Sequence, residues 1–180
     1  MSALAPALMA ASAAIIFALG LLHLVYTFRG NKLHPRDEQL MANMKSISPR
    51  IARQTTMWKA WIGFNASHSY GALLFGAVYG YLALAHSAFL FQSPFLLLLG
   101  LLLLAGYVLL AKLYWFSVPY RGIVASTVCY VAALGPSILS IAARPLVPKT
   151  FLATVFTTSV FAFASLRNDL QLRSGQNSPS

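Results

Sequence analysis

The sequence predicts an all-α membrane protein, a small bundle of five transmembrane helices, with four as the alternative. Three observations predict this class. Hydrophobic residues make up 58% of the 180-residue chain, and charged residues only 9%. The run from Pro94 to Ala111 has no charged side chain, and at about 1.5 Å per helical residue it is long enough to cross the hydrocarbon core. Finally, 13 lysines and arginines lie beside such runs, against only 3 acidic residues.

Five apolar segments are the candidate spans, and they place residues 1–180 in a single integral membrane domain. No positively charged region precedes the first segment, so we interpret it as a span and not as a secretory signal. The fifth segment is short and is alternatively an interfacial helix, which would leave four crossings. Residues 174–180 have no apolar side chain and are expected to form a disordered tail. The predicted spans are about 7–28, 58–85, 94–116, 121–142 and 149–166.

The basic residues predict the orientation, because the cytoplasmic loops of membrane proteins carry an excess of lysine and arginine. If all five segments cross, eleven basic residues fall on one side and only Arg144 and Lys149 on the other. A four-span layout would move Arg167 and Arg173 to the poorer side and weaken this bias. We therefore expect a multi-pass protein of the cell inner membrane, with its N-terminus outside and its C-terminus in the cytoplasm.

The longest connection, residues 29–57, is predicted to be a basic cytoplasmic loop. Apolar residues recur at helical spacing between residues 40 and 47, which indicates a short amphipathic helix along the membrane surface. The pair Ser48-Pro49 is typical of a helix start, so the helix of the second span is expected to begin there. Anionic lipid headgroups are the expected partners of the basic residues in 29–59.

Composition and motifs exclude several functional classes. The net charge of +10 lies beside apolar spans, so nucleic-acid binding is not expected. The single cysteine, Cys129, can form neither an intramolecular disulfide nor a Cys-x-x-Cys metal site. The three acids, Asp37, Glu38 and Asp169, lie outside the apolar segments, which leaves none for a buried Ser–His–Asp triad. The chain has no glycine-rich phosphate loop, and we assign no catalytic residue.

One set of polar residues falls inside the predicted spans. In the second span these residues share one face of a helix drawn at about 100° per residue. The first span offers a matching face at a similar depth, about 9–13 Å from the inner boundary. Unpaired imidazole or amide groups cost several kcal/mol in hydrocarbon, so they must face protein, water or a ligand. The set consists of His23, Tyr26 and Thr27 from the first span and Trp58, Trp61, Asn65, His68 and Ser69 from the second.

Three interpretations of these residues remain open. In the first they are interhelical hydrogen-bond partners, with His23 bonding Asn65 or Ser69 beside a strip of small residues, Ala72, Gly76 and Gly80. In the second they line a pocket for a lipid, a quinone or another apolar molecule, with walls formed by Trp58, Trp61, Tyr26 and Tyr79. In the third, His23 and His68 are the axial ligands of a haem b. Non-haem iron or zinc would need a third ligand, and no carboxylate or cysteine lies at that depth.

The runs HLVYTFRG and TTMWKAWIGFNASHS resemble a group of small, uncharacterised bacterial inner-membrane proteins. The resemblance covers the first two spans only. It implies a bacterial inner membrane, and it implies no mechanism because that group has no assigned activity. The residues that carry it are His23, Thr27, Arg29, Trp58, Trp61, Asn65, Ser67, His68 and Ser69.

The expected function is that of a non-enzymatic accessory protein or a subunit of a larger membrane assembly. The chain is small and has neither a membrane-embedded acid nor a separate soluble domain. Under this interpretation no cofactor is expected, and the partners are membrane lipids and other membrane proteins. The alternative is a redox module that binds haem b, a quinone or a lipid at His23 and His68.

Overall fold

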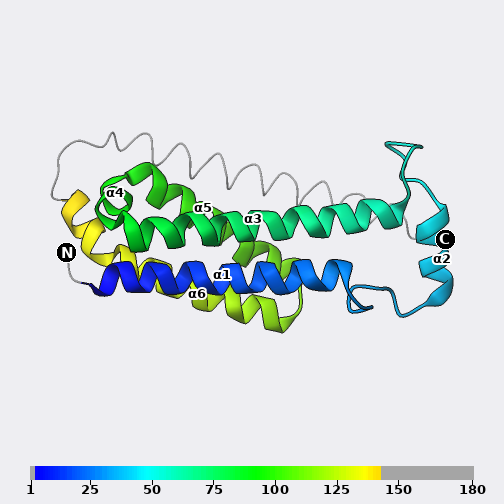
Figure 1. Ribbon diagram of the computed structural model, residues 1–180, viewed down its shortest axis with the longest axis horizontal. Coiled ribbons are helices and arrows are strands. Elements are labelled where there is room, and N and C mark those ends of the chain that lie inside the picture. Colours follow the sequence, from blue (N-terminus) through cyan, green and yellow to red (C-terminus); the bar gives the residue numbers. More distant parts are fainter. Residues whose placement is uncertain (1–2, 143–180) are drawn as a thin grey trace, which may run out of the picture. The chain divides into compact units, whose positions relative to one another are not determined.

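The structure is a computed structural model that describes residues 3–142 (Figure 1). This part of the chain consists of helices and contains no strand, which confirms the all-α prediction for the described residues. A short helix lies in the basic loop, where the sequence predicts one. The predicted fifth span, 149–166, and the predicted tail, 174–180, lie outside the described residues. The helices are α1 (Leu4–Phe28), α2 (Glu38–Ser46), α3 (Met57–Ala85), α4 (Ser87–Gln92), α5 (Pro94–Tyr114) and α6 (Ser117–Ala142).

Within residues 3–142, three helices are long and apolar enough to cross a membrane: α1, α5 and the Ser117–Gly135 part of α6. They correspond to the first, third and fourth predicted spans. Helix α3 covers the predicted second span and is the longest described helix, with 29 residues. It is not one of the three, because the amide, hydroxyl and imidazole groups between Asn65 and Ser69 lower its hydropathy. The membrane class is therefore supported, and a bundle of five crossing helices stays a prediction.

Helix α3 begins later than the sequence predicts. The side chain of Thr56 accepts a hydrogen bond from the Lys59 amide at 3.3 Å, and the helix starts at Met57. The prediction of a start at Ser48-Pro49 is wrong. The Ser48 hydroxyl donates instead to the carbonyl of Arg53 at 3.3 Å, within a non-helical segment. A threonine that can cap the first turn thus fixes the start of the helix.

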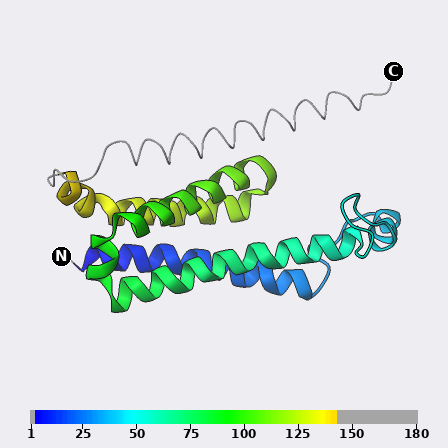
Figure 2. The same cartoon turned by 90° about the horizontal axis from the view of Figure 1, so that it is seen from above.

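Helices α1 and α3 lie side by side and run in opposite directions (Figures 1 and 2). A Cβ atom at Gly76 would lie only 2.5 Å from the Cβ of Phe17 and 2.8 Å from the carbonyl oxygen of Ala13. A Cβ atom at Gly20 would lie 2.8 Å from that of Ala72. Small residues let the backbones of membrane helices approach closely. The predicted strip of small residues on α3 therefore faces α1.

Two tyrosine hydroxyls connect α3 and α6 to the first turns of α5. Tyr79 donates to the Leu96 carbonyl at 2.6 Å, and Tyr130 donates to the Leu97 carbonyl at 2.9 Å. Both rings are buried, and their centroids are 6.0 Å apart in an edge-to-face arrangement. Gly100 lies against these rings, and a Cβ atom there would collide with Tyr130. The three helices thus meet in an aromatic core about three turns along α3 from His68.

A pair of buried serines connects α1 to α6. The Ser126 hydroxyl donates to the Ser12 carbonyl at 2.9 Å. Because that hydroxyl has a single hydrogen, the Ser12 hydroxyl must be the donor in the 2.8 Å contact between the two side-chain oxygens. Both side chains are fully buried. Each polar group therefore satisfies the other across the helix interface.

Candidate functional site

The structure brings together one histidine and one asparagine from facing helices. The Nε2 atom of His23 on α1 lies 3.0 Å from Oδ1 of Asn65 on α3. The amide nitrogen of Asn65 donates to the Trp61 carbonyl at 2.8 Å, which turns Oδ1 toward His23. Since Oδ1 is only an acceptor, Nε2 of His23 must carry the hydrogen. In the neutral imidazole, Nδ1 is then the acceptor nitrogen.

Two hydroxyl groups beside this pair are satisfied within their own helices. Thr27 donates to the His23 carbonyl at 2.8 Å, and Ser69 donates to the Asn65 carbonyl at 2.9 Å. Both residues are buried. Hydroxyls in membrane helices often bond the carbonyl four residues earlier, because this removes an unpaired donor from a dry environment. Neither hydroxyl is therefore a donor left over for a ligand.

His68 lies beside the pair within a group of aromatic rings. Its ring centroid is 5.6 Å from that of His23, with the two planes nearly perpendicular. It also contacts Tyr107 of α5 at 5.2 Å and Trp115, just after α5, at 4.6 Å. Such edge-to-face contacts are a favoured geometry for aromatic pairs. We call His23, Asn65, His68, Tyr107 and Trp115 the polar cluster.

Tyr107 and Trp115 were not expected in this cluster from the sequence. Trp115 stands next to Tyr114 where a span was predicted to end, and interfacial aromatic residues need no other explanation. The structure separates the two residues: Tyr114 is 63% exposed, whereas Trp115 is half-buried against His68. A further signal is Gly71, one turn from His68 on α3. A Cβ atom there would lie 3.0 Å from the Tyr107 hydroxyl, so this glycine lets the tyrosine approach α3.

The other aromatic residues of the predicted set lie elsewhere. Trp61 is 40% exposed, and its indole nitrogen donates to the Leu33 carbonyl at 3.2 Å. Trp58 contacts His34 with ring centroids 5.0 Å apart. Both tryptophans thus attach the start of α3 to the loop after α1. Tyr26 is near that loop as well, with the Lys32 ammonium 4.8 Å from its ring centroid, and Tyr79 belongs to the aromatic core.

Trp115 sets the level of the polar cluster. Trp115 follows α5 by one residue, so its contact with His68 places the cluster at the end of α5 that carries Lys112. Counting along α3 from Lys59 puts His68 about 13 Å farther along the helix axis. Lys59 and the end of α5 are thus at different heights along the bundle, because α1 and α3 extend past the ends of α5 and α6 on this side (Figures 1 and 2). The first turns of α3 therefore lie beyond the end of α5.

The geometry of His23 and His68 can be compared with what a metal ion or a haem would need. Among the described residues, no group of three His, Cys, Asp or Glu side chains is placed to hold a metal ion. An axial haem pair would need one nitrogen of each imidazole directed at a common iron. His23 and His68 instead meet edge to face, and Nε2 of His23 is bonded to Asn65. These two residues do not fit a haem in this conformation, because their rings are in direct edge-to-face contact and leave no room for a haem between them.

No protein-family model, curated protein or solved structure matches the chain.

Proposed function

We propose that this protein is a non-enzymatic multi-pass protein of the inner membrane that serves as an accessory protein or subunit of a larger membrane assembly. The observation that carries the proposal is how His23 and Asn65 of the polar cluster use their hydrogen bonds. His23 and Asn65 bond each other across α1 and α3. In the described part of the chain, no buried side-chain nitrogen or oxygen lacks a partner. Polar groups that are satisfied in this way serve to hold helices together.

The proposed topology includes α3 as a crossing helix. Its polar residues Asn65 and Ser69 are buried, and Asn65 bonds α1, so they avoid lipid. Because α1, α3 and α5 alternate in direction, the end of α1, the start of α3 and the end of α5 lie on one side. The basic residues Arg29, Lys59 and Lys112 lie at these three ends. By the positive-inside rule this side is cytoplasmic, and the N-terminus is outside.

The experiment is to purify the full chain in a mild detergent from the membrane in which it is made. We expect a colourless protein with no reducible absorption band, which migrates on a native gel as part of a larger, defined complex. The complex should dissociate under harsher detergent without loss of the helical circular dichroism of this chain. A protein that purifies as a lone chain with a bound chromophore would contradict the proposal.

A second candidate function follows from His68. The ring of His68 is enclosed on several sides by His23, Tyr107 and Trp115, yet no described residue forms a hydrogen bond with either of its nitrogens. An aromatic surround with a polar edge is typical of sites for apolar molecules such as a quinone or a lipid. Organic extraction of the purified protein followed by mass spectrometry tests this candidate. If this candidate function is right, the extract contains a quinone or a lipid in molar proportion to the chain.

A further inference from the structure

Helices α1 and α3 are longer than the part of them that α5 covers. They have 25 and 29 residues, which corresponds to about 37 and 43 Å, whereas α5 has 21 residues, or about 31 Å. The hydrocarbon core of a bilayer is about 30 Å thick, so α5 matches it and the other two helices exceed it. Figures 1 and 2 show this excess at the end of the bundle next to α2.

Two contacts fix the heights at which α5 and α6 end against this pair. Trp115, the residue after α5, contacts His68 of α3 with ring centroids 4.6 Å apart. Near the start of α6, a Cβ atom at Gly122 would lie 2.9 Å from a methyl carbon of Leu19 on α1. Both contacts lie well before the ends of α1 and α3 that lead into the loop. The ends of these two helices therefore stand free of α5 and α6.

The charges on α5 and α6 place the membrane boundary at these contacts. Lys112 is in the last turn of α5, and Arg121 precedes Gly122 on α6. Charged side chains are costly in hydrocarbon, so both need headgroups or water. On α3 the next charge is Lys59, about 13 Å beyond His68 along the helix axis. This length of α3, together with the end of α1, therefore lies beyond the hydrocarbon core.

The sides of α1 and α3 that α5 and α6 cover continue past this boundary and stay apolar. Tyr26 follows Leu19 by two turns, so it lies on the side of α1 that faces α6. Phe64 precedes His68 by one turn and lies on the side of α3 that faces α5. Because no helix covers it there, Phe64 is 70% exposed. We call four exposed aromatic residues the apolar step: Tyr26, Trp61, Phe64 and Phe116, which lies between α5 and α6.

The charged residues at the edges of the apolar step are all basic. Lys112 and Arg121 lie where α5 and α6 end, and Arg29 and Lys59 lie at the far ends of α1 and α3. The described helices α1, α3, α5 and α6 carry no aspartate or glutamate. A binding partner that matches this surface therefore needs an apolar face with negative charges on both sides of it.

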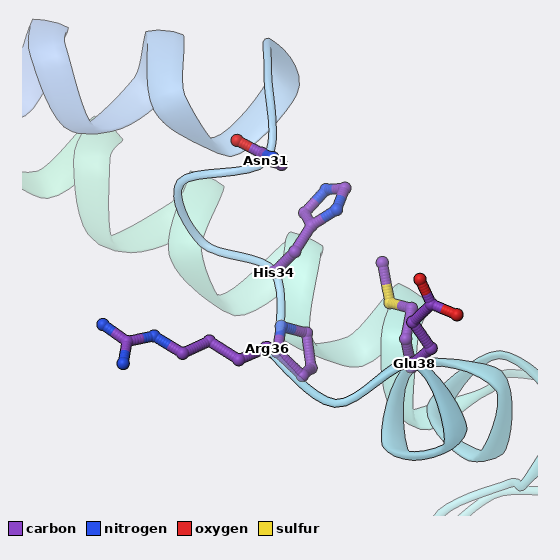
Figure 3. A pocket seen from close by; sticks show the side chains of 6 residues that line it. Asn31, His34, Arg36 and Glu38 are labelled. Atoms are coloured by element: carbon purple, nitrogen blue, oxygen red, sulfur yellow. The ribbon is translucent and has the colours of Figure 1, made fainter.

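The two acids of the described residues belong to α2 and its cap, at the far end of the bundle (Figure 1). Asp37 caps α2 by accepting from the Leu40 amide at 2.7 Å. Glu38 lies beside a loop pocket of about 390 Å³ (Figure 3). Its carboxylate and the Arg36 guanidinium point to different sides of the loop, so this pocket does not gather charges around one ligand. Neither acid neutralises the edge of the step at Lys112.

We propose that the apolar step docks a surface helix of a partner protein, whose apolar face is flanked by acidic residues. This inference rests on the proposed function, because it assigns the surface through which the chain joins a larger assembly. The apolar face of the partner covers the four aromatic side chains, and its acids meet Lys112 and Arg121. A second copy of this chain would bring basic edges against basic edges, which repel each other. Acyl chains do not cover the step, because it stands beyond the hydrocarbon core.

The first part of the test asks whether the step stands in water when no partner is present. The full chain, with Cys129 replaced by alanine, is reconstituted in opened phosphatidylcholine vesicles and treated with a water-soluble maleimide. Phe64→Cys should react, and so should Ala60→Cys, a second reporter one turn earlier that leaves the ring in place. Leu74→Cys is exposed about 15 Å farther into the membrane and should not react. A Phe64→Cys variant as unreactive as Leu74→Cys would place the step in the bilayer and overturn the proposal.

The second part repeats the labelling in opened membranes of the cell that makes the protein. Phe64→Cys should now be protected from the maleimide. Lys112→Gln combined with Arg121→Gln should restore its labelling, because the two substitutions remove the charges that meet the acids of the partner. The matched control is Lys45→Gln combined with Arg53→Gln, which removes two exposed charges of the loop outside the step and should leave the protection unchanged. Equal effects of the two pairs would overturn the proposal.

Other occupants of the step would give different results. Protection of Phe64→Cys in vesicles that contain phosphatidylglycerol would assign the step to an anionic lipid. Protection that grows with the density of the chain in phosphatidylcholine vesicles would assign it to a second copy, and either result overturns the proposal. Full labelling in the native membrane, with the chain still in a larger complex on a native gel, would refute the docking site and leave the proposed function standing. A lone chain on that gel would refute the proposed function itself.

Discussion

Replacing Gly76 by alanine should destabilise the protein because it pushes α1 and α3 apart. The new Cβ would lie 2.5 Å from the Phe17 Cβ, 2.8 Å from the Ala13 carbonyl oxygen and 2.9 Å from the Phe17 Cα. Two of these are backbone atoms, so no change of rotamer relieves the contact. Overpacking of this kind costs about 1–3 kcal/mol. Alanine regains about 0.5–1 kcal/mol of helix propensity, so the expected net loss is at most about 2.5 kcal/mol.

Gly63→Ala is the matched control, because it lies on the same helix and a Cβ there meets nothing within 4 Å. This variant should gain about 0.5–1 kcal/mol from the same propensity. The assay is reversible unfolding in mixed micelles, followed by circular dichroism, on both variants and the parent chain. The propensity gain is the same in both variants and cancels, so their free energies of unfolding should differ by the overpacking cost, about 1–3 kcal/mol. If Gly76→Ala is as stable as Gly63→Ala, α1 and α3 do not approach as closely as described.

Three further predictions concern topology and the buried polar groups. A reporter that is active only in the periplasm should be silent when it is fused after Ser180 and active when it is inserted between α3 and α5. An active fusion after Ser180 would mean that the chain crosses the membrane an even number of times, which contradicts five spans. His68→Gln should lower the free energy of unfolding by about 0.5–1.5 kcal/mol, because it removes the edge-to-face ring contacts of His68. A protein that loses a bound quinone or lipid on this change would favour the second candidate function. Ser126→Ala should cost about 0.6–1.7 kcal/mol in the same unfolding assay, because its partner is left unpaired, and the exposed Ser67→Ala should have almost no effect.

The long apolar helices could be predicted from the sequence because apolarity is a local property of a segment. Helices α1, α5 and α6 follow their predicted spans within a few residues at most ends. The contact between α1 and α3 could also be predicted from the sequence, since His23 and Asn65 lie at a similar depth and the small residues of α3 share one face. The start of α3 could not be predicted, because Ser48 and Thr56 are both residue types that cap helices well. Only the path of the loop decides between them.

The contacts made by α5 and α6 could not be predicted. Ser12 and Ser126 are 114 positions apart, and each looks like an ordinary hydroxyl of a membrane helix. Trp115 has a sufficient explanation as an interfacial aromatic residue, so nothing in the sequence directs it to His68. Periodicity tells which face of one helix is polar. It does not tell which of several neighbouring helices that face meets, and this choice depends on packing of the whole bundle.

The central claim is that His23 and Asn65 are partners that hold α1 against α3. A double-mutant cycle with His23→Phe and Asn65→Leu tests it most directly, because the cycle isolates the energy that the two side chains share. The measured quantity is the free energy of unfolding of the parent chain, both single variants and the double variant in the same mixed micelles. We predict a coupling of about 0.6–1.7 kcal/mol in favour of the native pair. Purely additive effects of the two substitutions would contradict it.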